Sequence, residues 1–239
     1  MKELLEPVLK QLPSYLPHMG GLLLSPKTTI VHWVKEAKGD LSRPLIFVGL
    51  TIAIGFVLQL PQLGKGQEFM VHAASMGLFK IVALAIFAAI IHFLFRMVGG
   101  NASFTATFSA YLYLASPLYL AGLLIELASM GVLRAYDPAL VLEARTDPFY
   151  FLAHPDVKRQ FSADSPILAF VYELLKNGNI FLILAWFIAC WGAFRQLHNV
   201  GRWRSSAVGI AVAISFVFYM LAMYFVLVGM VNLPRPPLL

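Results

Sequence analysis

Residues 96–117 read RMVGGNASFTATFSAYLYLASP and form a short polar joint between two long apolar runs. Gly99 and Gly100 end the first run, and Ser103 stands where its side-chain oxygen can cap the helix of the second run. Pro117 follows inside the second run, where membrane helices tolerate a proline if neighbouring groups satisfy the freed carbonyl. The stretch therefore predicts a tight reversal between two membrane-spanning helices.

The composition around this joint is that of an integral membrane protein. Of the 239 residues, 59% are hydrophobic and 13% are charged, and the mean hydropathy is +0.76. Soluble domains average about 45–50% apolar and about 25% charged residues, so a soluble fold would lack the charge to cover its surface. The formal net charge of +6 comes from Lys and Arg that flank apolar runs, which indicates membrane topology and anionic lipid headgroups rather than nucleic acid.

Outward from the joint, the apolar runs predict an all-α integral membrane protein with five transmembrane helices and an amphipathic N-terminal segment. A long polar connection, residues 134–178, is expected to cap one face of the bundle, and Asp164 or Ser165 before Pro166 can begin a helix within it. Residues 234–239 form a tail. The spans of the membrane domain, residues 44–233, are expected at about residues 44–60, 75–98, 104–133, 180–197 and 207–233.

Residues 1–43 are expected to form a cytosolic or interfacial amphipathic segment. The leucines of residues 1–12 fall on one helical face, and Pro13 and Pro17 are expected to end that helix. Ser25 before Pro26 is a typical start of a second helix, which either lies on the membrane surface or packs on the protein's own spans. The start of the chain lacks the pattern of a cleavable signal peptide, so we expect insertion to rely on the first span.

An odd number of spans places the two termini on opposite sides of the membrane. The face that carries residues 1–43, the joint and the basic connection after the fourth span holds more Lys and Arg next to spans than the other face. The positive-inside rule makes that face cytosolic, with the N-terminus inside and the C-terminus outside. Contacts with lipid headgroups are expected there from Arg96, Arg195, Arg202 and Arg204.

Ionisable residues inside the spans are candidates for function because burying them in a bilayer is costly. Lys80 and Glu126 are expected at similar depth on neighbouring antiparallel spans, where they either form an ion pair or reach the headgroups independently. His92 is expected level with Tyr111, and a hydrogen bond between them would be a structural contact. The alternative is a transporter or channel component that uses Lys80, His92 and Glu126 along a path.

The sequence carries no recognisable motif for catalysis, metal binding or a cofactor. The histidines lack the spacing of a metal site, and the single cysteine, Cys190, lies inside an apolar run. We therefore expect no enzyme activity, no cofactor, no metal and no nucleic-acid partner. The expected partners are the lipid bilayer and another membrane protein or a second copy of the chain. Small residues every four positions in the fourth and fifth spans favour close helix contacts within the bundle or between copies.

Two segments carry a family resemblance. LLLSPKTTIVHWVKE, residues 22–36, places a leucine run and Ser25-Pro26 before an amphipathic turn with Trp33. GGNASFTATFSAYLYLASPLYLAGLL, residues 99–124, places a Gly-rich joint before a phenylalanine, a tyrosine and a proline, at Gly99, Gly100, Phe104, Tyr111 or Tyr113, and Pro117. This order resembles the bacterial branch of the Yip family, membrane proteins named for their interaction with Ypt/Rab GTPases. The resemblance implies a non-enzymatic scaffold, or a subunit of a complex in a bacterial inner membrane.

Overall fold

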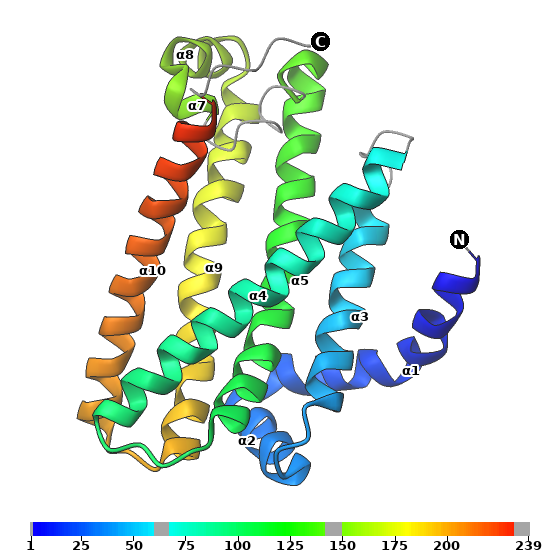
Figure 1. Ribbon diagram of the computed structural model, residues 1–239. Coiled ribbons are helices and arrows are strands. Elements are labelled where there is room, and N and C mark those ends of the chain that lie inside the picture. Colours follow the sequence, from blue (N-terminus) through cyan, green and yellow to red (C-terminus); the bar gives the residue numbers. More distant parts are fainter. Residues whose placement is uncertain (1, 60–66, 142–149, 232–239) are drawn as a thin grey trace, which may run out of the picture.

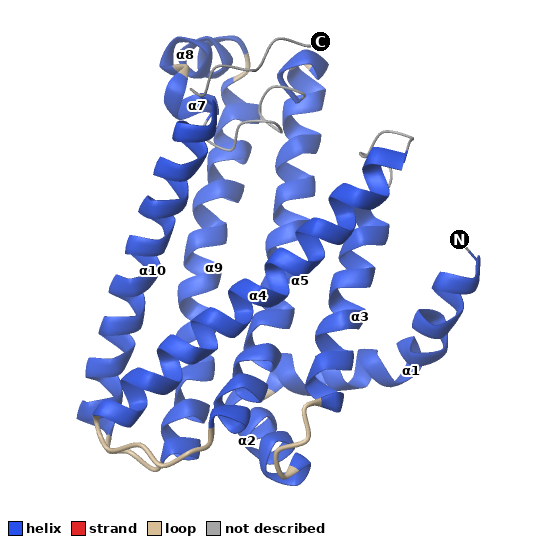
Figure 2. Cartoon of the chain, in the orientation of Figure 1, coloured by secondary structure: helices blue, strands red, loops and turns tan. Residues whose placement is uncertain are grey.

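The computed structural model describes the backbone of residues 2–59, 67–141 and 150–231, and the side chains of residues 13–59, 82–141, 150–151 and 154–218. The elements in this part of the chain are helices (Figures 1 and 2). In chain order they are α1 (Lys2–Leu24), α2 (Pro26–Ala37), α3 (Ser42–Gln59), α4 (Gln67–Met97), α5 (Phe104–Tyr136), α7 (Tyr150–Ala153), α8 (Pro155–Asp164), α9 (Pro166–His198) and α10 (Arg202–Val231).

The five longest helices outside α1 are α3, α4, α5, α9 and α10. In Figure 1, α4 crosses in front of α5 and α9 at an oblique angle, and α3 is the shortest of the five. The central helix is α5, which packs against α3, α4 and α9. Three of the five, α3, α5 and α9, are long and apolar enough to cross a membrane, and the described side chains of α4 cover a shorter apolar stretch, Val82–Met97. The part of the chain that the structure describes is thus all-helical with three candidate membrane spans, whereas five spans require α4 and α10 as well.

The prediction that Pro13 and Pro17 end the first helix is wrong. α1 is continuous from Lys2 to Leu24 and lies across the lower parts of α3 and α5 (Figure 1). An interior proline costs a helix roughly 3 kcal/mol, whereas full burial of one large apolar side chain stabilises by roughly 1.5–3 kcal/mol. The face of α1 turned to the core offsets the proline cost with three buried side chains at helical spacing, Tyr15, Met19 and Leu22.

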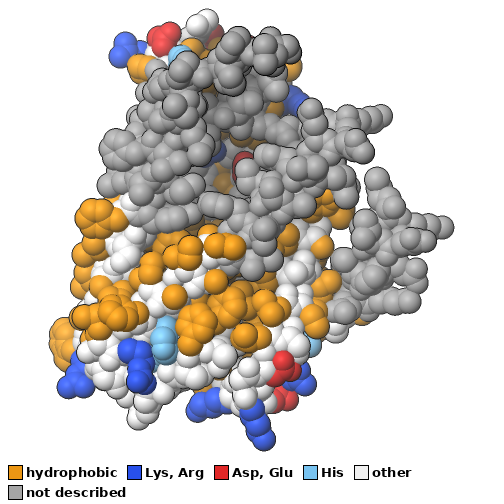
Figure 3. Space-filling model, in the orientation of Figure 1, with side chains coloured by type: hydrophobic (Ala, Val, Ile, Leu, Met, Phe, Trp, Pro, Cys, Tyr) orange, Lys and Arg blue, Asp and Glu red, His pale blue; other side chains and the backbone are white. Residues whose placement is uncertain are grey.

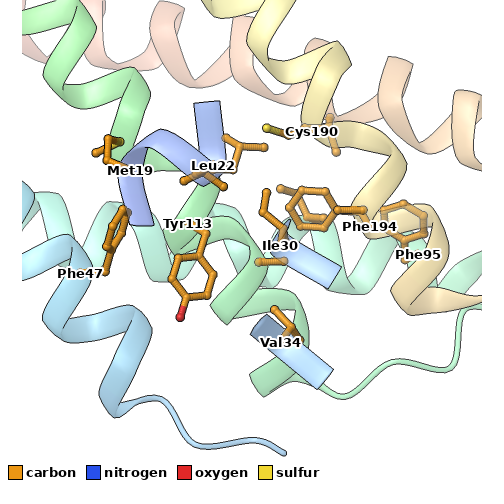
Figure 4. Close-up of a cluster of buried hydrophobic side chains, with 14 of the residues drawn as sticks. Met19, Leu22, Ile30, Val34, Phe47, Phe95, Tyr113, Cys190 and Phe194 are labelled. Carbon is orange, nitrogen blue, oxygen red and sulfur yellow. The ribbon is translucent and has the colours of Figure 1, made fainter. Parts of the chain in front are cut away.

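Of the two positions expected for the second helix, the structure shows packing on the protein's own spans. Ile30 and Val34 of α2 are buried in the main core cluster together with Cys190 and Phe194 of α9 (Figure 4). α2 begins at Pro26 with Ser25 at the N-cap, as predicted, although the Ser25 side chain makes no capping hydrogen bond.

The helix predicted to begin after Asp164 or Ser165 is continuous with the helix of the expected fourth span. With Ser165 at its N-cap, α9 starts at Pro166 and runs unbroken to His198, so the end of the expected 134–178 connection belongs to a helix of membrane length. The early turns form because Ala169 and Tyr172 are buried in a second cluster with Phe161 of α8. Two polar contacts also hold α8: the Tyr136 hydroxyl donates to Asp164 at 2.9 Å, and Lys158 lies 2.6 Å from Glu173.

Candidate functional site at the cationic end

The joint after α4 and the short turn after α9 meet at one end of the bundle. The backbone N–H of Asn101 donates to the carbonyl oxygen of His198 at 3.2 Å. From the start of α10, the Arg204 guanidinium donates to the carbonyl oxygen of Val98 at 3.4 Å. The two connections are therefore joined by hydrogen bonds, although about one hundred residues separate them in sequence.

The two glycines of the joint are required for different reasons. Gly99 has a φ of +91°, a left-handed conformation that glycine adopts without steric cost. A Cβ atom on Gly100 would lie 2.7 Å from the carbonyl oxygen of Phe95 and 2.7 Å from Nδ1 of His198. At the other side of the joint, the Ser103 hydroxyl accepts the backbone N–H of Ala106 at 3.2 Å, which confirms its predicted role as a cap.

Thr107 lies at the centre of a buried polar cluster beneath the joint. Its hydroxyl donates to the carbonyl oxygen of Ser103 at 3.1 Å. The same oxygen lies 3.1 Å from Nδ1 of His92 and 2.9 Å from Nε2 of His198. Because a hydroxyl has one hydrogen and two lone pairs, this geometry assigns the N–H donors to His92 Nδ1 and His198 Nε2. One threonine thus connects α4, α5 and α9.

The ring of His198 is enclosed by its neighbours. It is fully buried and stacks on Phe95 with ring centroids 4.4 Å apart. Its Nδ1 faces Gly100 and has no hydrogen-bond partner in the described part of the chain. The partner of His92 Nδ1 is Thr107, one helical turn before the Tyr111 that we expected. Both histidines therefore join helices to one another at this end, His92 from α4 and His198 from α9, through Thr107 of α5.

The remaining residues singled out from the sequence occupy separate places. Phe104 stacks on Phe108, and Tyr111 is partly buried against the core. Pro117 is buried within α5, which continues on both sides of it. Glu126 is exposed, but the side chain of Lys80 lies outside the described residues, so their ion pair stays a prediction.

Cationic side chains gather at the joint end, below the apolar band in Figure 3. The four arginines expected to contact lipid headgroups lie here: three are exposed, Arg195 is half-buried, and Arg96 donates to the Gly100 carbonyl at 3.3 Å. Among the described residues, Lys27, Lys35, Lys38 and Arg43 add to them, against the acidic Glu36 and Asp40. The backbone N–H and the hydroxyl of Ser42 bind Asp40 and lower the pKa of its carboxyl group.

A pocket of about 390 Å³ lies at the same end between α1, α2, α3 and α5, and we call it the aromatic pocket. The Trp33 ring contacts three other rings, with centroid distances of 5.2 Å to His18, 6.3 Å to Phe47 and 4.9 Å to Tyr113. A charged pair also lines it, Arg43 and Glu36, whose nearest atoms are 3.6 Å apart. The lining residues are Ser14, Tyr15, His18, Trp33, Glu36, Arg43, Ile46, Phe47, Leu50 and Tyr113.

Neither the Thr107 cluster nor the aromatic pocket was predicted from the sequence. The pocket had one usable signal, since Tyr15, Met19 and Leu22 keep a helical period across Pro17. Thr107 and His198 gave no local signal, because their partners lie far away in sequence. Within the described residues, no group of three or more His, Cys, Asp or Glu side chains lies close enough to hold a metal ion.

Comparison with known proteins agrees with the resemblance carried by the joint. Residues 20–229 match the Yip1 domain family, a match that runs from the end of α1 to the last turns of α10. No curated protein and no solved structure gives a match. Because the matched residues make up most of the chain, this membrane protein belongs to the Yip1 domain family.

Proposed function

We propose that this protein is a non-enzymatic, five-span membrane scaffold or a subunit of a bacterial inner-membrane complex. The Yip family is not a known enzyme family, which fits this assignment. The observation that carries the proposal is a long apolar face of α9 that the rest of the described chain leaves uncovered.

This face of α9 is long enough to pack against a second membrane-spanning helix. Five large apolar side chains lie along it at helical spacing with 59–77% of their surface exposed: Ile167, Phe170, Leu174, Phe181 and Ile188. From the first to the last, the helix rises about 30 Å, close to the thickness of the hydrocarbon layer. Ala185 and Ala189 are exposed along the same helix, and small residues at this spacing allow close approach of a second helix.

Partner capture from the native membrane tests the proposed role. A benzophenone-bearing residue at Ile188 is expected to cross-link to another membrane protein, or to a second copy of the chain. The same residue at Ile214 of α10, which is 51% exposed, is the matched control and should cross-link to lipid. A chain that purifies in mild detergent as a lone monomer and cross-links only to lipid at both positions would contradict the scaffold role.

The proposed topology has α3, α4, α5, α9 and α10 as spans, a cytosolic N-terminus and an outer C-terminus. The cations gathered at the joint end support it, because Lys and Arg next to spans favour the cytosolic side. The test uses a Cys190→Ala background, since Cys190 is the single cysteine. In intact cells, a membrane-impermeant maleimide should label Arg159→Cys on α8 and leave Lys38→Cys unlabelled until the cells are opened. The reverse labelling would overturn the orientation.

Transport along Lys80, His92 and Glu126 stays an untested alternative. His92 is bonded to Thr107 at the cationic end, and Glu126 is exposed. No observation in the described residues favours a path between them.

A further inference from the structure

The aromatic pocket combines two kinds of surface that suit an amphiphilic ligand. Its walls are largely aromatic and aliphatic, with Phe47, Leu50 and Tyr113 on the inner side. Arg43 and Glu36 are more than half exposed, so the charged pair stands at the mouth. Pockets for small ligands typically measure about 300–1,000 Å³ and are mainly apolar with a few polar groups, and this pocket has that character.

The position of the pocket fits the level of lipid headgroups. Arg43 is in the first turn of α3, at the cationic end, and Leu50 lies about 10 Å further along the same helix. The pocket therefore extends from the headgroup level to the edge of the hydrocarbon layer. Ile46, which lines it, is 48% exposed on the outer surface of α3, so an acyl chain can leave along that side.

The charges at the mouth select the kind of headgroup. Arg43 offers N–H donors to a phosphate, and Glu36 accepts hydrogen bonds from an ammonium group. Their separation of 3.6 Å and their exposure make the pair weak, so a ligand can insert between them at low cost. Tyr113 supplies a hydroxyl that makes no hydrogen bond within the described chain, and it projects between Phe47 and Val34 (Figure 4).

The arrangement of the rings favours a primary over a quaternary ammonium group. A quaternary ammonium binds to open aromatic faces. Here the rings of Trp33, Phe47 and Tyr113 pack against one another, at 4.9–6.3 Å between centroids, so they do not form an open cage. A primary ammonium has N–H groups that donate hydrogen bonds to a carboxylate, and Glu36 provides that carboxylate.

We propose that the aromatic pocket binds one phosphatidylethanolamine molecule, with its phosphate at Arg43 and its primary ammonium at Glu36. The site is separate from the exposed α9 face, so it stands or falls independently of the scaffold role. It would hold α1 against α2 and α3 through a lipid of the cytosolic leaflet.

The test is lipid binding to the delipidated full-length chain, followed by native mass spectrometry. The probes are phosphatidylethanolamine, phosphatidylcholine and phosphatidylglycerol with identical acyl chains. One phosphatidylethanolamine is expected to bind at least tenfold more tightly than either of the others. Equal affinity for the three lipids would overturn the proposal. Free phosphoethanolamine that competes as strongly as the intact lipid would also overturn it, because the apolar walls would then contribute nothing.

Substitutions locate the binding. Arg43→Gln and Glu36→Gln are each expected to lower phosphatidylethanolamine affinity about tenfold or more, whereas Lys35→Gln, an exposed cation on α2 that does not line the pocket, should leave it unchanged. Ile46→Trp, which blocks the side along which the acyl chain leaves, should abolish phosphatidylethanolamine binding without lowering the unfolding temperature, so lost binding is distinguished from a failure to fold. Unchanged affinity in Arg43→Gln and Ile46→Trp would place the lipid elsewhere and overturn the assignment.

Discussion

Nε2 of His198 lies 2.9 Å from the hydroxyl oxygen of Thr107, a residue 91 positions earlier in the chain. Both residues are fully buried. This contact, extended to His92 by the same hydroxyl, fixes how α9 and α4 meet the start of α5. At the cationic end of the bundle, one buried oxygen atom therefore joins three helices.

Thr107→Val is expected to destabilise the protein. Valine has nearly the same shape but leaves the imidazole N–H groups of His92 and His198 without their acceptor. For the fully buried His198 this loss costs about 1–3 kcal/mol, and for the partly buried His92 it costs less. The free energy of unfolding in detergent measures the effect. Thr28→Val, which removes an exposed hydroxyl that donates to the carbonyl oxygen of the N-cap residue Ser25, is the control. Equal stability of the two variants would show that the cluster does not hold the helices together.

Gly100→Ala tests the close approach at the joint. The added Cβ would meet the Phe95 carbonyl oxygen, a backbone atom that cannot turn away, so we expect a loss of about 1–3 kcal/mol from overpacking. Gly131→Ala on α5 is the control, because nothing lies within 4 Å of its added Cβ. That control should leave stability unchanged or raise it slightly, since alanine favours a helix. A melting temperature for Gly100→Ala equal to that of the control would contradict the packing of His198 against the joint.

Leu22→Ala tests whether α1 belongs to the folded core. Leu22 is fully buried, and removing such a side chain costs about 2–5 kcal/mol. Leu24 is 87% exposed two residues later, so Leu24→Ala is a matched control that should cost little. Thermal unfolding of the two variants under the same conditions gives the comparison. Indistinguishable unfolding would mean that α1 does not pack as a continuous helix.

The Asp40 carboxyl group is expected to make stability depend on pH. Its pKa is lowered in the folded protein by the backbone N–H and hydroxyl of Ser42, so the unfolded chain takes up the proton first as the pH falls. The stabilisation is therefore complete above the pKa of the unfolded group, near 3.9, and is lost as the pH falls through the folded pKa.

Unfolding of the parent protein and of Asp40→Asn across acidic and neutral pH measures this effect. The two should differ in stability at neutral pH and converge at the acidic end. Ser42→Ala removes the hydroxyl donor but keeps the backbone N–H, so it should weaken the pH dependence without abolishing it. A difference between parent and Asp40→Asn that does not change with pH would contradict the role of Asp40.

Local rules were enough to predict the ends of several helices. Ser103 caps α5, Pro26 begins α2, and Gly99 takes a left-handed conformation after α4, because each of these features depends on residues within one turn. The helical class and the resemblance to the Yip family followed from apolar patterning and from the order of features around the joint, and the family match confirms the resemblance.

Features that depend on distant residues were not predicted. Pro13 and Pro17 were interpreted as the end of a helix because the local pattern does not show the contacts with α2, α3 and α5 that hold α1. The partner of His92 was placed one helical turn too far along α5, since depth counted along a helix does not give the rotation of its side chains. The pocket under α1 also depends on where α1 lies.

The burial of α1 and α2 has a consequence for the order of assembly during synthesis. The core around Leu22 and Ile30 is complete only after Cys190 and Phe194 have been synthesised and have packed into it. At roughly 5–20 residues per second, the chain needs on the order of 10 s to extend from Ile30 to Cys190. α1 and α2 thus leave the ribosome well before α9, and until α9 arrives the apolar side chains that it covers are open to lipid or to a chaperone.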